Sequence, residues 1–431
     1  MKAILDVNQF VERLDGAGKL DRISRTVSPI HELASIAVAH ERADGGAVLF
    51  EAVKGSDIPL VANLYSERDR VSLAFGASGT DLHELFLSAM NNGVKPKMIA
   101  KGPVMERTVD SLDALPIPVH SLRDAGRYLT CLMTTKAQGT RVMQHVRAEV
   151  KGPRKLGVRI DPGRKFWDVS KGLEKVEVCL VIGAPPAVEF AAALRGRAQD
   201  KLEIAGALQR APVELVQCEE VDCQAPARSE IILEGVVDLK HVEMEGPFAE
   251  FTGYYSPPEP MPVVKVSRIS MRRNAVHRTI VGASKEHLTL NNVAREAIIY
   301  ESVRKAVPGV VDVYLPAFAG GFIAFISVKY DYVAMAKNAL LSALSAHPVV
   351  KCAVVVDEEV DIHDEREVLW AIATRSGGDE DVLLVPHAYG HVMDPAGEKG
   401  YVNKLGIDAT FTAEKKKLYR KVEYAKVRGE A

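Results

Sequence analysis

The chain has 431 residues, and 55 lysines and arginines against 57 aspartates and glutamates give it a formal charge of −2. This balance excludes a non-specific nucleic-acid binder, which needs a basic excess. Hydrophobic residues make up 47% and charged residues 26%, a composition typical of a folded protein. The length suggests two or three domains. The first residues lack the pattern of a secretory signal and no apolar run is long enough to cross a bilayer, so we expect a cytoplasmic protein without a membrane span.

The N-terminal region alternates between helix and strand patterns. Residues 6–16 place apolar side chains at helical spacing between an aspartate and a glycine, which predicts a short helix. Prolines interrupt the pattern between residues 101 and 118, so we place the end of an α/β region near residue 105. The other expected elements are a helix that begins near Pro29, strands at 47–53 and 59–65, and helices near 67–75 and 80–91.

A β-rich middle domain is expected over residues 106–293, because residues 129–160 and 210–281 contain repeated strand patterns. A strand, a Gly-Pro turn and a helix in VEVCLVIGAPPAVEFAAALRG interrupt it. From a helix expected at Ala294, helices and strands alternate again, which predicts a C-terminal α/β domain over residues 294–414. Residues 415–431 carry seven lysines or arginines and predict an exposed tail; the alternative is a partner-binding arm.

The segment EGPFAEFTGYYSPP, residues 245–258, holds two glutamates five positions apart. Its glycines and prolines forbid a continuous helix, so we expect Glu245 and Glu250 on a tight loop between strands. If a cation stands between them, one glutamate stays ionised while the more buried one donates a proton near neutral pH. The alternative is a turn whose glutamates face solvent.

Basic residues recur beside glycines and prolines in residues 139–165, among them His145, Arg147 and Arg159. Arginine binds carboxylate and phosphate groups with two parallel hydrogen bonds, so this stretch is suited to holding an anionic group. The alternative is a solvated, charged hairpin.

Acids and a histidine also cluster in residues 354–364, as if to bind a metal, but the spacing favours the end of a strand followed by a helix that Asp361 or Asp364 caps. The sequence contains no GxGxxG dinucleotide fingerprint, GxxxxGK[ST] phosphate loop or GxSxG nucleophile elbow.

Taken together, these segments resemble the UbiD family of reversible (de)carboxylases. The similarity runs from VSPIHELASI and GGAVLFEAVKG through DAGRYLT, EIAGALQRAPVELVQCE and EGPFAEFTGYYS to VVVDEEVDIHDEREVLWAIATR and NKLGIDAT. It implies an α/β N-terminal region, a central split β-barrel of the flavin-reductase-like kind, and a C-terminal α/β domain used in oligomerisation. The implied activity is non-oxidative decarboxylation or carboxylation of an aromatic, heteroaromatic or α,β-unsaturated carboxylic acid. The implied cofactor is prenylated FMN, which a flavin prenyltransferase supplies.

The resemblance also implies roles for individual residues. Arg147 would anchor the substrate carboxylate and pair with Glu245, while Glu250 would supply the proton that replaces CO2. The residues implied at the cofactor are His145, Arg159, Glu203 and Lys404, and those implied at the substrate pocket are Phe248, Phe251, His287 and Leu290.

The sequence departs from the family at the positions that hold a divalent metal. Val142 stands at the asparagine position and Arg159 at the histidine position, so Glu203 is the one family ligand that remains. Valine and arginine cannot ligate a metal, and the sequence therefore does not predict the family's usual metal site.

Two hypotheses account for this departure. In the first, Arg159 binds the phosphate of prenylated FMN directly. In the second, the protein is a flavin-free member that acts on a phosphorylated substrate or serves as a subunit of a multi-component carboxylase. A non-enzymatic alternative is an accessory subunit that keeps the fold without activity. By resemblance, we expect a homo-oligomer, either a dimer or a hexamer.

Overall fold

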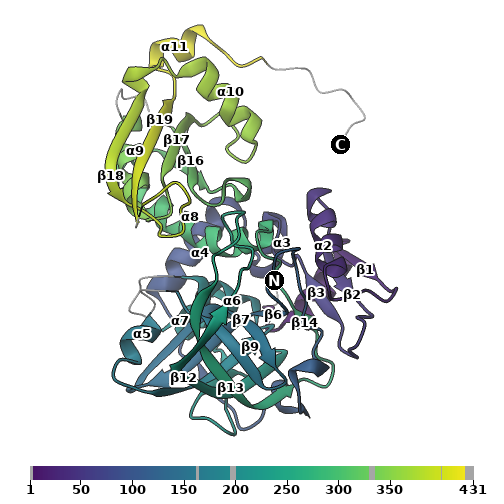
Figure 1. The fold of residues 1–431 in the computed structure, drawn as a ribbon. Helices are drawn as coiled ribbons and strands as arrows, with labels where there is room; N and C mark the ends of the chain where they lie inside the picture. The colour runs from purple at the N-terminus through teal and green to yellow at the C-terminus, as the bar shows by residue number, and fades with distance from the viewer. Residues whose placement is uncertain (1–2, 162–164, 195–199, 330–334, 399, 423–431) are drawn as a thin grey trace. The chain divides into compact units, whose positions relative to one another are not determined.

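The protein is described by a computed structural model that covers residues 3–161, 165–194, 200–329, 335–398 and 400–422. These residues form two compact units, Met1–Arg295 and Glu296–Ala431 (Figure 1). The predicted fold class, a mixed α/β chain with a central barrel and a C-terminal α/β domain, is confirmed. No helix in the described part of the chain has the length and hydropathy that a membrane span requires.

The N-terminal region begins with α1 (Val7–Gly16), which starts where predicted because the Asp6 side chain accepts a hydrogen bond from the Gln9 backbone at 2.9 Å. A four-stranded sheet of order β1-β2-β3-β14 follows, and the apolar face of α2 packs on it. Its last strand, β14, comes from the far end of the barrel segment, so the chain returns to this sheet. The bounds are β1 (Leu20–Ile23), α2 (Glu32–Arg42), β2 (Ala47–Phe50), β3 (Leu60–Ala62), α3 (Arg68–Phe75), α4 (Gly79–Asn91) and β14 (His277–Arg278).

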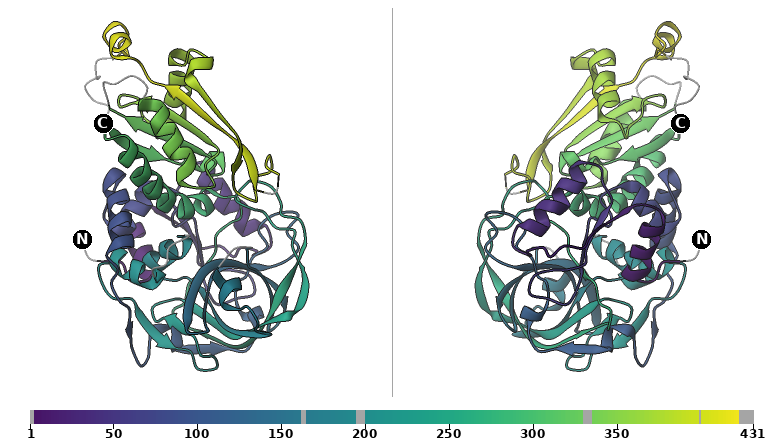
Figure 2. Two further views of the ribbon diagram at one scale, coloured as in Figure 1. Left: turned by 90° about the vertical axis from the view of Figure 1, so that its left-hand side faces the viewer. Right: turned by 90° about the vertical axis from the view of Figure 1, so that its right-hand side faces the viewer.

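Six antiparallel strands close into the barrel in the order β12-β9-β6-β7-β8-β13, because β12 also pairs with β13 (Figure 2). Side chains alternate along each strand, so Val142, Val146 and Ala148 of β7 point into the barrel core. Arg147 therefore lies on the outer face of β7. The bounds are β5 (Arg107–Val109), which extends the sheet beside β13, β6 (Tyr128–Ala137), β7 (Thr140–Gly152), β8 (Lys155–Arg159), β9 (Lys175–Ile182), β12 (Ile231–Glu245) and β13 (Glu259–Met271).

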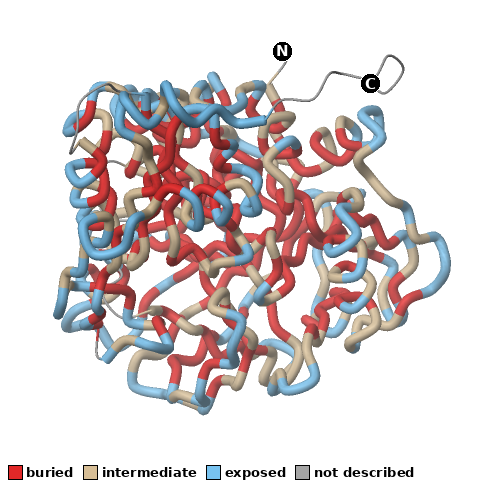
Figure 3. The backbone as a smooth tube through the Cα atoms, turned by 90° about the horizontal axis from the view of Figure 1, so that it is seen from above, coloured by how far each residue is buried: buried red, intermediate tan, exposed pale blue. Residues whose placement is uncertain are grey.

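The predicted helical excursion leaves the barrel after β9. Helix α6 follows Gly183 and Pro185 and begins at Pro186. It packs against the outer face of β7, where the Glu189 carbonyl lies 2.9 Å from the His145 imidazole. Figure 3 colours the backbone by burial, and the buried residues, in red, form continuous runs in the interior. The bounds are β4 (Lys97–Met98), α5 (Lys165–Val169), α6 (Pro186–Ala193), α7 (Lys201–Leu208), β10 (Glu214–Gln217) and β11 (Gln224–Pro226).

Helix α8 (Lys285–Ala306) begins well before the predicted start at Ala294, because the Ser284 hydroxyl accepts a hydrogen bond from the His287 backbone at 3.2 Å. The C-terminal sheet has the order β15-β16-β17-β19-β18, with α9 against one face and α10 against the other. Of the two predicted capping residues, Asp361 and Asp364, it is Asp364 that caps α10. The bounds are β15 (Val310–Tyr314), β16 (Ile323–Val328), α9 (Met335–Ala346), β17 (Cys352–Asp357), α10 (Glu365–Arg375), β18 (Val382–Tyr389), β19 (Tyr401–Ala409) and α11 (Ala413–Leu418).

The basic tail expected from residue 415 begins inside α11, and its described residues are largely exposed. Its last part, residues 423–431, lies outside the described residues.

Candidate active site

The structure brings Arg147, Glu245 and Glu250 together on the outer side of the barrel. Glu245 Oε1 accepts a hydrogen bond from Arg147 Nε at 2.7 Å, and Glu245 Oε2 accepts one from Nη2 at 3.1 Å. Glu250 Oε1 accepts a hydrogen bond from Nη1 at 2.6 Å. Glu245 is fully buried and Glu250 is 9% exposed, so the alternative of a turn with solvent-facing glutamates does not hold.

The charges of this group are unequal in number, with two carboxylates around one guanidinium. Burial lowers the pKa of Arg147, but the hydrogen bonds and charges of Glu245 and Glu250 outweigh burial and raise it overall, so Arg147 stays a cation. Because Glu245 binds the guanidinium through both oxygens, these two residues form a neutral, bidentate pair. The negative charge of Glu250 is not needed to balance this pair. Glu250 is the less buried of the two glutamates, so this arrangement differs from the expectation that the more buried glutamate donates the proton.

The two glutamates differ in how the backbone holds them. The expectation that both lie on a loop is wrong for Glu245, which is the last residue of β12 and pairs with Glu259 of β13. The ladder continues to this residue because the chain turns only at Gly246, whose φ of +88° suits glycine. Glu250 does lie on the loop, where a turn at Gly253 lets the Gly253 amide donate to the Glu250 carbonyl at 2.9 Å.

Arg159 faces Arg147 across the β7–β8 ladder and lies on the same outer face. Its Nη1 lies 3.1 Å from Glu259 Oε2, and its Nε lies 4.0 Å from both Glu250 Oε1 and Asp161 Oδ1. Neither nitrogen has the alignment of a hydrogen bond with any described residue, although both are buried. Both nitrogens therefore make ion-pair contacts with carboxylates but donate no aligned hydrogen bond to a described residue.

The residues predicted at the cofactor are spread over the chain. His145 lies on β7 two residues before Arg147, and Glu203 lies on α7. Lys404 is buried on β19 in the C-terminal unit, where its Nζ donates to the Leu344 carbonyl at 2.5 Å. The Val142 side chain packs in the barrel core, on the opposite side of β7 from Arg147.

The donor chemistry does not fit the family's metal site, because position 142 carries an apolar side chain in the core and position 159 carries a cation. No group of three or more histidines, cysteines, aspartates or glutamates among the described residues is placed to hold a metal ion.

Of the predicted pocket residues, Phe248 and Phe251 belong to the same loop, and His287 and Leu290 lie on α8. Phe248 is fully buried, and the Arg147 Cζ lies 4.6 Å from its ring centroid, so this side chain supports the guanidinium. The Phe251 and His287 rings lie 6.2 Å apart, and Leu290 is buried on α8. Burial, followed by the charges of Arg147 and Arg295, lowers the pKa of His287 to about 4, so this imidazole is neutral at neutral pH.

Sequence reasoning missed two contributors to the site. The Ser256 hydroxyl accepts a hydrogen bond from Arg147 Nη2 at 3.4 Å and donates to the Phe248 carbonyl at 3.3 Å. Glu259 lies beside Arg159 as described above. Ser256 lies inside the quoted segment EGPFAEFTGYYSPP and Glu259 follows it directly, so a search for further polar side chains in and just after this segment is the signal that could have found them.

Comparison with known proteins gives matches over nearly the whole chain. The family models described as the N-terminal, Rift-related and C-terminal domains of 3-octaprenyl-4-hydroxybenzoate carboxy-lyase match residues 11–90, 97–284 and 288–409. The anhydromevalonate phosphate decarboxylase of Methanothermobacter thermautotrophicus is 34% identical over 393 residues, which cover 89% of this chain and 92% of that protein.

Two solved structures are similar in fold and sequence. The UbiD-class enzyme HmfF from Pelotomaculum thermopropionicum, in complex with FMN, has a TM-score of 0.92 and 36% identity, with 97% of each chain covered. The apo 3,4-dihydroxybenzoic acid decarboxylase AroY from Klebsiella pneumoniae has a TM-score of 0.92 and 27% identity, with 98% of each chain covered.

Proposed function

Since this chain belongs to the UbiD family and is a carboxy-lyase, we propose that Glu250 donates the proton that replaces the carboxyl group of an aromatic, heteroaromatic or α,β-unsaturated acid. The net reaction converts the carboxylate and one proton into CO2 and a C–H bond. No electron acceptor is consumed.

The observation that carries this proposal is the unequal sharing of Arg147 by its two glutamates. Glu245 takes two N–H groups and balances the guanidinium charge, while Glu250 takes one and is slightly exposed. Protonation of Glu250 therefore leaves a neutral Arg147–Glu245 pair and no unpaired buried charge. A carboxyl group that can gain and lose a proton beside a fixed ion pair is suited to general acid and base chemistry.

Arg147 has room for one further acceptor. Four of its five N–H groups have partners among the described residues, in Glu245, Glu250 and Ser256, which leaves one on Nη1. In the proposed mechanism the substrate carboxylate accepts this N–H group. Protonated Glu250 binds the guanidinium less tightly than the carboxylate does, so substrate binding and proton uptake by Glu250 favour each other.

A flavin cofactor is part of the proposal, because FMN is bound in the similar HmfF structure. Prenylated FMN, when bound, supplies an electrophile that takes up the electron pair left by CO2. The Nε and Nη1 groups of Arg159 donate no aligned hydrogen bond to a described residue and suit an anionic phosphate, and we assign this residue to the cofactor phosphate without a metal. His145, Glu203 and Lys404 remain predicted members of that site.

Replacement of Glu250 tests the proposed acid. Protein produced together with a flavin prenyltransferase would be assayed for CO2 release from a panel of unsaturated and aromatic acids. We expect Glu250→Gln to lower kcat by about 100-fold or more, the usual contribution of a positioned acid. Glu243→Gln is the matched control, because Glu243 lies on β12, just before the loop that carries Glu250, and pairs with Lys155 near the surface. Equal turnover by both variants would refute the role of Glu250.

A second candidate function is decarboxylation of a phosphorylated acid, in which Arg159 binds the substrate phosphate. The same N–H groups, which donate no aligned hydrogen bond to a described residue, support it, and so does the relative named anhydromevalonate phosphate decarboxylase. Arg159→Gln separates the two candidates. Loss of bound flavin assigns Arg159 to the cofactor, whereas full flavin content with a KM raised about tenfold for a phosphorylated acid assigns it to the substrate. Arg154→Gln, at an exposed arginine of the same hairpin, is the control.

A further inference from the structure

Two aromatic rings in contact, those of Phe248 and Tyr128, support the Arg147 guanidinium from one side. The Phe248 ring is directly below it, and the Tyr128 ring meets Phe248 edge-on, with the centroids 4.6 Å apart and the planes at 61°. Both rings are buried. The position of the guanidinium over Phe248 therefore depends on where Tyr128 holds that ring.

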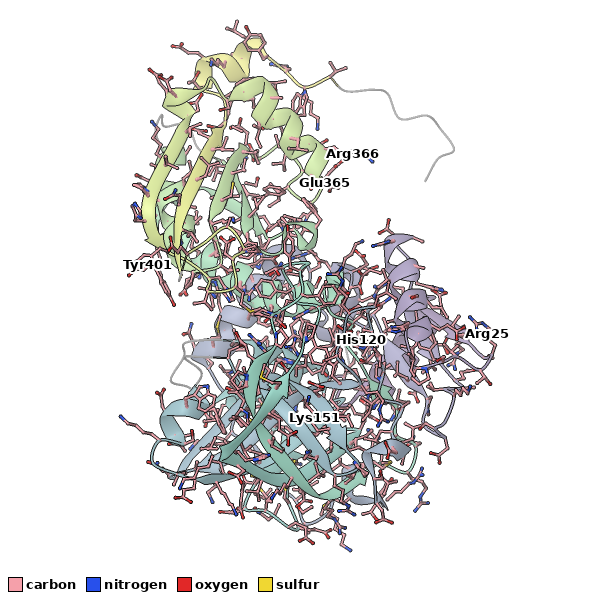
Figure 4. All side chains as sticks on the ribbon, viewed as in Figure 1. Arg25, His120, Lys151, Glu365, Arg366 and Tyr401 are labelled. Atoms are coloured by element: carbon pink, nitrogen blue, oxygen red, sulfur yellow. The ribbon has the colours of Figure 1, made fainter. Side chains whose placement is uncertain are left out.

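The hydroxyl of Tyr128 is tied to a buried histidine. Tyr128 Oη lies 2.5 Å from His120 Nδ1, and His120 Nε2 lies 3.0 Å from the Thr279 hydroxyl. Burial lowers the pKa of His120 to about 3, so the imidazole is neutral and has one donor and one acceptor for these two hydroxyls. Figure 4 labels His120 in the N-terminal unit. These bonds fix the far end of the Tyr128 ring.

The same chain segment, residues 120–128, also holds the loop that carries Glu250. The Ala125 amide donates to the Pro247 carbonyl at 2.9 Å, and the Ala249 amide donates to Asp124 Oδ1 at 3.1 Å. The segment thus contacts the loop at Pro247, through the Phe248 ring and at Ala249, the three residues that precede Glu250.

We propose that Tyr128 is a positioning residue for decarboxylation, which orients Arg147 through Phe248 and keeps Glu250 in register with it. This inference rests on the proposed function. Tyr128 touches none of the reacting groups in this assignment, and its hydroxyl acts through the ring that it anchors. Misplacement of catalytic groups by about 1 Å costs up to about 100-fold in rate, so a partial loosening costs about tenfold.

Tyr128→Phe keeps the ring and removes the bond to His120. We expect kcat to fall about tenfold while KM changes less than twofold and the flavin content stays the same. Tyr65→Phe is the matched control, because Tyr65 is equally buried in the N-terminal unit and its ring packs against Phe10 and Phe190 instead of Phe248. A purely structural role for Tyr128 would lower Tm and leave kcat unchanged at a temperature where the protein is folded, and that result would overturn the proposal.

Two variants of His120 test the same bond from its other end. Asparagine places an amide atom near the Nδ1 position, so His120→Asn is expected to retain more of the wild-type kcat than His120→Ala, with equal flavin content. Equal kcat values in these two variants would also overturn the proposal. Failure of the proposed function is distinguishable, because Glu250→Gln would then turn over normally, whereas failure of this inference leaves Glu250→Gln inactive and Tyr128→Phe fully active.

Discussion

Removal of the Glu245 charge should lower both the stability and the turnover of the enzyme. In Glu245→Gln the fully buried carboxylate that binds Arg147 at 2.7 and 3.1 Å becomes a neutral amide. Removing one partner of a buried ion pair costs about 3–5 kcal/mol. Because the amide still accepts one hydrogen bond and Glu250 still neutralises the guanidinium, we expect a loss of about 3 kcal/mol in the free energy of unfolding.

The same change also removes one of the two hydrogen bonds through which residue 245 orients Arg147. Because misplacement of catalytic groups by about 1 Å costs up to about 100-fold in rate, we expect kcat to fall about tenfold. Urea unfolding and CO2 release by the flavin-loaded protein measure the two effects. Glu243→Gln, at the more exposed pair with Lys155, should change neither. A Glu245→Gln protein with wild-type stability and wild-type kcat would refute the reasoning.

Three further predictions concern stability, packing and assembly. The pKa of His120 is about 3 in the folded state and 6.5 in the unfolded state, so on acidification the unfolded state binds more protons. Between pH 6.5 and 4.5, the unfolding free energy of the wild type should therefore fall by about 2–3 kcal/mol relative to that of His120→Asn. Urea unfolding at the two pH values measures this difference. Gly282→Ala should lower kcat, because the new Cβ would lie 2.7 Å from the Ala249 carbonyl oxygen, and a wild-type rate would contradict this. Leu384→Lys should shift the predicted homo-oligomer towards the monomer in light scattering, because Leu384 is 63% exposed on edge strand β18.

The elements with strong local signals were predictable from the sequence. Helix α1 has both an aspartate cap and apolar side chains at helical spacing, and α10 begins after Asp364 as one of two predicted caps. The early start of α8 was missed, because its first turn, KEHL, is mostly polar and its cap is a serine whose role shows only in three dimensions. Local patterns thus located elements more reliably than their ends.

The site was predictable in its residues and less so in its geometry. The resemblance identified Arg147, Glu245 and Glu250, but neither motif spacing nor composition could place Glu245 on a strand, because pairing with Glu259 depends on the register of β12 and β13. The proximity of Arg159 to Glu250 likewise depends on the β7–β8 register. The support of Arg147 by Phe248 and Tyr128 joins segments more than 100 residues apart, which no local pattern encodes.

The origin of the proton in the product tests the central claim most directly. The flavin-loaded enzyme would convert the most rapidly used acid of the panel in D2O, and mass spectrometry and NMR would locate the deuterium. The account predicts one deuterium at the carbon that lost CO2, formed at least about 100-fold more slowly by Glu250→Gln than by Glu243→Gln. A product without deuterium at that carbon, or equal rates for the two variants, would contradict it.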